Sequence, residues 1–181
     1  MADNAKRAAW PDQERITAER VILEPLSIRH ATEMVDVLAD ASVYAFTEGE
    51  APSLARLESR YTTQTAGRSP DGSQQWLNWI VRRQDSDAAV GFVQATVERI
   101  AGGAENPTLV ANLAWVVAPA HRGQGIASEA TGAMIGWLRL HGVGSFAAFI
   151  RPNHFASIGV ARNQGLHPTS IAKHGETRWE S

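Results

Sequence analysis

A glycine-containing turn carries the clearest chemistry in the sequence. An apolar segment, 113–118, ends at Pro119 and is followed by Arg122-Gly123-Gln124-Gly125-Ile126-Ala127. Glycine has no Cβ, so it lets the backbone approach a bulky anion closely. The first N–H groups of a helix have no intrahelical partner, and the helix dipole is positive there. With Arg122 as a nearby fixed cation, such a turn suits a pyrophosphate.

Taken alone, the glycine pair has a second interpretation with about the same support, in which Gly123 and Gly125 merely permit a tight strand-to-helix turn. Two nucleotide-binding motifs fit less well. A dinucleotide fingerprint lacks its third glycine, because Ser128 stands there, and no acidic residue follows about 20 positions later, around 146–149. A P-loop is absent, because the sequence contains no Gly-Lys-Ser or Gly-Lys-Thr. These features disfavour a nicotinamide or ATP enzyme.

The elements before this turn follow from hydrophobic periodicity. Aliphatic and β-branched residues from Ile16 to Leu26 predict a first strand that ends before Pro25. Helical spacing predicts a helix from the cap Ser27 to about Ala39. A second helix is predicted over 54–63 and a loop over 65–73, and three strands follow, at Trp76–Arg83, Val90–Arg99 and Leu109–Val117, joined by turns at 84–87 and 101–107.

Beyond the turn the apolar period becomes helical. The pattern predicts a helix over Gly125–Leu140, a strand over Ser145–Ile150, a helix that opens near Asn153 and stops at Gly165, and one or two strands over 168–180 around His174-Gly175. An antiparallel first half with one strand-helix-strand crossover predicts a single α+β or α/β sheet. We expect a flexible N-terminal arm over 1–14 and one domain over 15–181.

Composition excludes several classes of function. The 181 residues carry a net charge of -2 and show no basic face, so a nucleic-acid partner is not expected. Without cysteine there is no disulfide, thiolate zinc site or cysteine nucleophile, and the six histidines lack ligand spacing, so no metal is predicted. No apolar run approaches the roughly 18 residues of a membrane span, and no signal peptide is present. The expected location is the cytoplasm.

The segment 122–127 matches the pattern R/Q-x-x-G-x-G/A and follows an apolar strand. In both respects it resembles the GNAT superfamily of N-acetyltransferases. The segment 17–26 looks like the first strand of that superfamily's Rim-type branch, the ribosomal-protein alanine N-acetyltransferases. Asn153–Ser157 with Gly165-Leu166 looks like its second cofactor motif, and 175–179 like its last strand. The resemblance implies a mixed, mostly antiparallel sheet with flanking helices and a central bulged, splayed strand pair.

The resemblance also implies a cofactor site for acetyl-coenzyme A, without a metal. In the superfamily the strand before the turn is bulged, and pantetheine pairs with its free edge. A backbone N–H of that strand polarises the thioester carbonyl, and Asn153 would hydrogen-bond the pantetheine arm. The implied cofactor-binding residues are Trp115, Val116, Val117, Arg122, Gly123, Gln124, Gly125, Ile126, Ala127, Asn153 and Ser157.

The proton-transfer groups are less clear. Many Rim-type relatives have a glutamate where this chain has Asn112, and an amide cannot take a proton. Many other members have a tyrosine as general acid where this chain has Ala161. Ser157 is then the candidate general acid, although a serine on the helix surface fits equally well. The candidates for the base are Glu48, Glu50, Glu98 and His154, each more readily explained as a solvated charge or a cap, and a water chain is an alternative.

The sequence therefore predicts an N-acetyltransferase that moves acetyl from acetyl-CoA to a primary amine. The acceptor is either a small molecule, such as a metabolite or antibiotic, or a protein N-terminus. The acidic loop 48–50 mildly favours a small or cationic acceptor. A catalytically weak acyl-CoA-binding sensor or scaffold is the alternative, supported by Asn112. A homodimer is left open.

Overall fold

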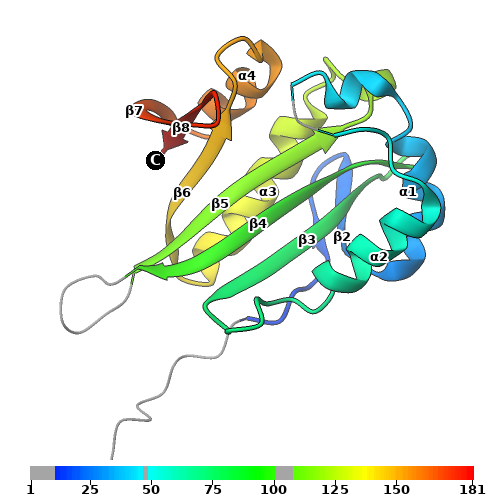
Figure 1. Cartoon of the computed structure of the whole chain (residues 1–181), viewed down its shortest axis with the longest axis horizontal. Coiled ribbons are helices and arrows are strands. Elements are labelled where there is room, and N and C mark those ends of the chain that lie inside the picture. Colours follow the sequence, from blue (N-terminus) through cyan, green and yellow to red (C-terminus); the bar gives the residue numbers. More distant parts are fainter. Residues whose placement is uncertain (1–10, 47–48, 101–107) are drawn as a thin grey trace, which may run out of the picture.

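An eight-stranded sheet in the order β1-β2-β3-β4-β5-β6-β8-β7 forms the centre of the molecule (Figure 1). The structure, a computed structural model, describes residues 11–46, 49–100 and 108–181. The strands are β1 (Ile16–Thr17), β2 (Val21–Pro25), β3 (Gln74–Arg83), β4 (Ala89–Ile100), β5 (Thr108–Val117), β6 (Val143–Ile150), β7 (His167–Lys173) and β8 (Glu176–Glu180). Within these ranges every strand pair is antiparallel except β5–β6.

Helices cover both faces of this sheet. The α-helices are α1 (Ala31–Val37), α2 (Leu54–Gln64), α3 (Ile126–Leu140) and α4 (Phe155–Asn163), and the short 3-10 helices are η1 (Ile28–His30), η2 (Ala41–Tyr44) and η3 (Pro119–His121). In Figure 1, α3 lies behind the sheet and α1 and α2 lie in front of it. The sheet is therefore the middle layer of three.

Strand alternation divides the apolar residues between these two faces. Trp79, Val93 and Leu113 belong to the main core, which includes the buried side of α3. Their neighbours Ile80 and Phe92 belong to a second cluster with α1 and α2. The two faces thus have separate cores, and the face toward α1 and α2 becomes polar farther along the strands.

The central strands β5 and β6 separate along their length. β5 pairs with β4 over its whole length, from Thr108 to Val117, but with β6 only from Leu109 to Asn112. The remaining stretch of β5, 113–117, has no ladder partner on the β6 side in the part of the chain that the structure describes. We call this stretch the free edge. The predicted splayed pair is thereby confirmed.

The irregularity in this pair lies on the other strand from the one the resemblance implied. Leu109 faces Val143 and Val110 faces Ser145, so the extra residue is Gly144 of β6. The register of β5 with β4 is continuous. The strand before the turn is therefore not the bulged one, and its divergence from β6 begins after Asn112.

Most predicted elements are found, and the differences have local causes. The strand predicted over Ile16–Leu26 is two strands, because Arg20 donates its backbone N–H to Glu129 of α3 (2.6 Å) and the chain turns there. The helix predicted up to Ala39 begins as η1 and ends at Val37. The hairpin over β3 and β4, the crossover through α3 and the last hairpin are as predicted. The turn predicted over 101–107 lies outside the described residues.

The predicted N-terminal arm needs a correction at its end. Residues 11–14 are held against the sheet, with the carbonyl of Pro11 accepting from Gln75 (2.7 Å) and that of Glu14 from the indole of Trp79 (2.8 Å). The Glu14 carboxylate accepts from the indole of Trp137 in α3 (2.6 Å). These buried indole donors need acceptors, so residues 11–14 belong with the domain. Residues 1–10 lie outside the described residues.

Candidate functional site

The turn between β5 and α3 presents backbone donors at a helix N-terminus. Gly123 and Gly125 have φ values of 74° and 77°, in the left-handed region that favours glycine. The first intrahelical hydrogen bond runs from Glu129 N–H to Gly125 C=O (3.0 Å). The N–H groups of residues 126–128 therefore have no intrahelical acceptor and face outward at the positive end of a 15-residue helix. This arrangement can bind an anion.

Charged side chains hold this turn from outside. Arg20 pairs with Glu129 (Nε to Oε2, 2.7 Å) and donates to the Gln124 carbonyl (2.8 Å). Arg83 donates to the Gln124 side-chain oxygen (3.0 Å). These bonds fix the backbone carbonyl and the side chain of Gln124 in the turn before an anion arrives, which reduces the entropic cost of binding.

Arg122 bridges the end of β5 to the segment after α1. Its Nε donates to the Val117 carbonyl (3.1 Å), and its terminal nitrogens lie 3.4 Å and 3.5 Å from the hydroxyl and carbonyl oxygens of Ser42. The guanidinium is mostly solvent-exposed and holds no carboxylate within the described chain. Arg122 is therefore available as a cation at the end of the free edge.

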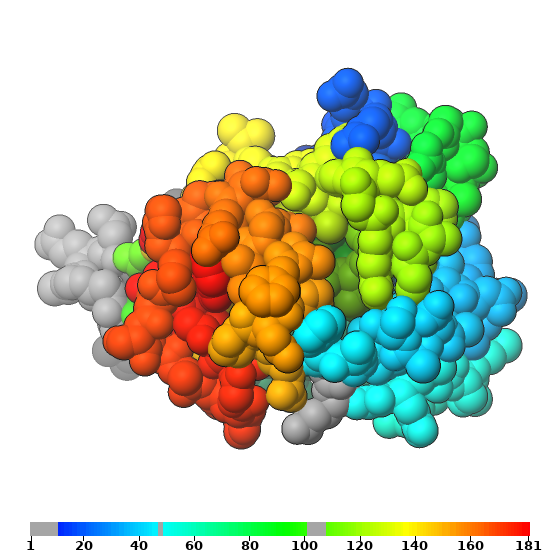
Figure 2. Space-filling view, turned by 90° about the horizontal axis from the view of Figure 1, so that it is seen from above, coloured from blue at the N-terminus to red at the C-terminus, as the bar shows by residue number. Residues whose placement is uncertain are grey.

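A segment over Ala41–Phe46, which we call the strap, lies across the diverging ends of β5 and β6, which we call the fork. Besides the Ser42 contact, the Phe46 carbonyl accepts from Arg151 at the end of β6 (2.7 Å), and the Phe46 ring stacks on His154 with centroids 4.1 Å apart. Figure 2 shows the result from above: the yellow-green turn before α3, the orange segment that enters α4 and the cyan strap ring a hollow. Sequence reasoning missed this strap, because nothing local marks its contacts.

The start of α4 forms the second side of the hollow. His154 is the N-cap, its Nδ1 accepting from the Ser157 N–H (3.3 Å). Its Nε2 lies 3.3 Å from the Ser157 hydroxyl oxygen. Burial, with a contribution from the charge of Arg122, holds the pKa of His154 below its ordinary value. A neutral His154 that donates from Nε2 leaves the hydroxyl proton of Ser157 free for another acceptor. Asn153, one residue earlier, is exposed.

Replacing His154 with asparagine is expected to remove part of the pH dependence of stability. A histidine whose pKa is lowered by folding stabilises the protein above its unfolded pKa of about 6.5, and this contribution is lost as the pH falls through the folded value. Asparagine also caps helices but does not titrate. As the pH is lowered from about 7 to 5, the midpoint temperature of thermal unfolding should fall less steeply in H154N than in the wild type. An unchanged slope would show that His154 is not buried in its neutral form.

The other predicted proton-transfer groups are dispersed. Asn112 is the last residue of β5 paired with β6, and its side-chain oxygen is buried without a partner in the described structure. Glu98 accepts from the Gln74 side chain (2.6 Å), and Glu50 pairs with Arg56 at the surface (3.3 Å). Ala161 is fully buried and its methyl side chain has no proton to donate, so this position offers no acid. Glu48 lies outside the described residues.

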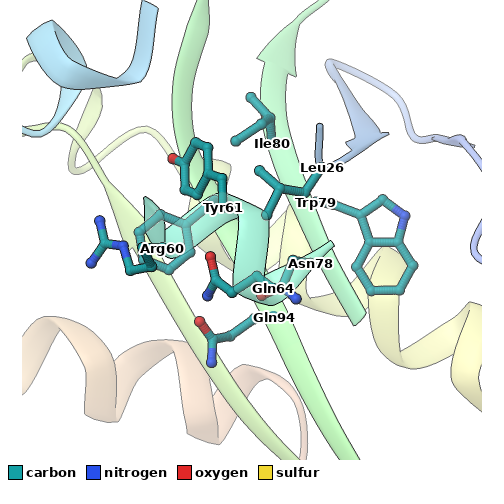
Figure 3. A pocket seen from close by; sticks show the side chains of 9 residues that line it. Leu26, Arg60, Tyr61, Gln64, Asn78, Trp79, Ile80 and Gln94 are labelled. Carbon is teal, nitrogen blue, oxygen red and sulfur yellow. The ribbon is translucent and has the colours of Figure 1, made fainter. Parts of the chain in front are cut away.

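A row of amide side chains lies beside the free edge, on the face toward α2. Asn78 of β3 is directly opposite Gln94 of β4, and Gln94 is opposite Ala114 of the free edge. Asn78 and Gln94 line a pocket of about 40 Å³ together with the residue that follows β2, residues of α2 and neighbouring residues of β3 and β4, namely Leu26, Arg60, Tyr61, Gln64, Trp79, Ile80 and Phe92. Figure 3 shows the amide groups gathered on one side of this pocket. The polar residues alternate with core residues in both strands, which is the signal that sequence reasoning overlooked.

Residues 20–167 match the acetyltransferase (GNAT) domain family. The chain belongs to this family. The predicted superfamily and fold are therefore confirmed. No curated protein sequence matches the chain significantly.

Solved structures agree with the fold. The chain resembles RimL, a ribosomal L7/L12 alpha-N-protein acetyltransferase solved with coenzyme A (TM-score 0.72, 15% identity, covering 93% of this chain and 97% of that one). It also resembles a GNAT-family acetyltransferase from Bacillus anthracis (0.69, 15%, 92% and 96%). A third is an acetyltransferase from Agrobacterium tumefaciens (0.68, 16%, 98% and 99%). At these identities the likeness establishes the fold.

The described residues contain no group of three or more histidine, aspartate or glutamate side chains placed to hold a metal ion. None of their helices is long and apolar enough to cross a membrane.

Proposed function

We propose that this GNAT-family protein transfers acetyl from acetyl-CoA to a primary amine, on a small molecule or a protein N-terminus, by direct attack. The observation that carries the proposal is the free edge of β5, which ends at a helix N-terminus with unpaired N–H groups. A pantetheine arm has amides that pair with such an edge, and its pyrophosphate suits the helix terminus. Both halves of one ligand thus have adjoining sites.

The chain's own groups divide the binding between them. The N–H groups of residues 126–128 and the turn 122–125 hold the pyrophosphate. The backbone of Trp115–Val117 pairs with pantetheine, and Asn153 reaches it from the α4 side. A β5 N–H near the fork donates to the thioester carbonyl, and such donors contribute about 3 to 4 kcal/mol to lowering the barrier.

Proton transfer follows from which groups are unoccupied. The amine must lose a proton, yet Asn112 cannot take one, and the carboxylates of Glu98 and Glu50 are both engaged. We therefore assign this proton to water, with the neutral amine selected by the site. As the nitrogen bonds to the carbonyl carbon and the carbon–sulfur bond breaks, Ser157 donates its hydroxyl proton to the departing sulfur. Ser157 regains a proton through water from the attacking nitrogen, which keeps one hydrogen as the amide N–H.

Asn112 and Ala161 also support a second function, a catalytically weak acyl-CoA-binding sensor or scaffold. Both positions lack an ionisable group. Such a module would use the same free edge and turn but would release no thiol.

Coenzyme A binding and thiol release separate these functions. At 100 times its Kd, CoA should stabilise the protein by about 2.7 kcal/mol, measured by thermal or chemical unfolding. Free-thiol release from acetyl-CoA is then followed with panels of amines and peptides. Stabilisation with turnover supports the transferase, stabilisation without turnover supports the binding module, and no stabilisation would overturn both.

A further inference from the structure

The pocket beside the free edge has hydrogen-bonding capacity that the protein leaves unused. The side-chain amides of Gln64, Asn78 and Gln94 make no hydrogen bond with other described residues. Tyr61 is only 4% exposed, and its buried hydroxyl has no hydrogen-bond partner among the described residues. Burial raises the pKa of Tyr61 to about 12, so the hydroxyl keeps its proton. Among the three amides Asn78 is buried and Gln64 and Gln94 are half-buried. Buried polar groups without partners are costly, which favours a ligand that supplies the partners.

The charge of this pocket is positive. Arg60 is the one charged residue of its lining. Within the described chain no carboxylate lies within 4 Å of its guanidinium, whereas Arg56, one turn earlier on α2, pairs with Glu50. The acidic loop that mildly favoured a cationic acceptor therefore does not line the pocket in its described part. A cationic acceptor would meet Arg60 unfavourably.

The pocket also lies at the right distance from the fork. Gln94 is one strand from Ala114 of the free edge and Asn78 is two strands away, which is about 5 Å and 10 Å at ordinary strand spacing. Ala114 is small and exposed, so it leaves this route open. The volume of about 40 Å³ holds roughly three water-sized groups. Because Gln94 neighbours the free edge and Arg60 lines the same pocket, a short molecule bound here lies between the free edge and Arg60.

We propose that the acceptor is a small amino acid whose carboxylate binds Arg60 while its amine faces the fork. The side-chain amides of Gln64, Asn78 and Gln94 donate to the carboxylate oxygens as well, and its short hydrocarbon part packs on Leu26, Ile80 and Phe92. Arginine matches carboxylate geometry with paired N–H groups. This inference rests on the proposed function, because it names the substrate of the same site.

The experiment compares amino acids with their own carboxamides. Glycine, alanine, β-alanine and their three carboxamides are tested as acceptors by thiol release. The wild type, R60Q and R56Q are compared. Arg56 lies one turn before Arg60 on α2 but does not line the pocket, so R56Q is the control. The carboxylate-to-carboxamide ratio of kcat/KM should fall about tenfold in R60Q and stay unchanged in R56Q. Comparing this ratio between the wild type and each variant cancels the different basicities of the amines.

Each other outcome overturns the proposal. One such outcome is turnover of polyamines, O-phosphoethanolamine or peptides but of no amino acid. Another is a carboxylate-to-carboxamide ratio of kcat/KM in R60Q that equals the wild-type ratio. If no amine is turned over, N-acetylglycine and N-acetylglycinamide are compared for stabilisation of the CoA complex, and a carboxylate preference absent or insensitive to R60Q overturns it as well. Loss of CoA stabilisation in the wild type would instead overturn the proposed function.

Discussion

Replacing Gly91 with alanine is expected to destabilise the protein by about 3 kcal/mol and to weaken CoA binding. Gly91 faces Val117 across the β4–β5 ladder. A Cβ at this position would lie 2.0 Å from the carbonyl oxygen of Val116, a backbone atom that cannot rotate away. β5 would have to move at Val116 and Val117, which belong to the free edge. The same displacement should therefore lower both the stability of the protein and its affinity for CoA. Chemical denaturation and CoA titration measure the two effects.

Gly144 provides the matched control. It is also a strand glycine, in β6, but a Cβ there would meet nothing within 4 Å. G144A should therefore change stability by less than about 1 kcal/mol and leave CoA binding intact. If G91A is as stable as G144A, the β4–β5 approach is looser than the structure indicates, and the fixed position of the free edge would be in doubt.

Elements with a strong local pattern could be predicted from the sequence. The crossover through α3 was predictable because its apolar residues recur at helical spacing and glycines bound it at both ends. The glycine turn was also predictable from local sequence, because positive φ at Gly123 and Gly125 favours glycine at these two positions. The family likeness added the pairing of β5 with β6, which local periodicity does not contain.

Features that depend on distant residues could not be predicted. The break at Arg20 is fixed by Glu129, more than a hundred residues later. The strap near Ser42 is held by Arg122 and Arg151 across the fork. The amide row needed the register of β3 on β4, and a slip by one residue would have turned those side chains to the other face. Local pattern thus predicted the glycine turn of the proposed cofactor site, while tertiary contacts form the proposed acceptor pocket.

Replacing Gly125 with alanine is expected to lower CoA affinity at least about tenfold. A left-handed conformation costs a residue with a Cβ roughly 1 to 2 kcal/mol, and the new Cβ would lie 3.3 Å from a terminal nitrogen of Arg20. The strain is relieved if the turn moves, but the N–H groups of residues 126–128 then lose their common direction. Isothermal titration with CoA measures the loss directly.

Gly142, at the other end of α3, separates strain from binding. It has a similar φ of 84°, and a Cβ there would meet nothing within 4 Å. G142A and G125A should therefore lose similar free energies of unfolding, while G142A keeps the wild-type affinity for CoA. Equal affinities in the two variants would mean that the helix N-terminus does not hold the pyrophosphate. A loss confined to G125A would place the anion at that end of the helix, because both variants carry the same backbone strain.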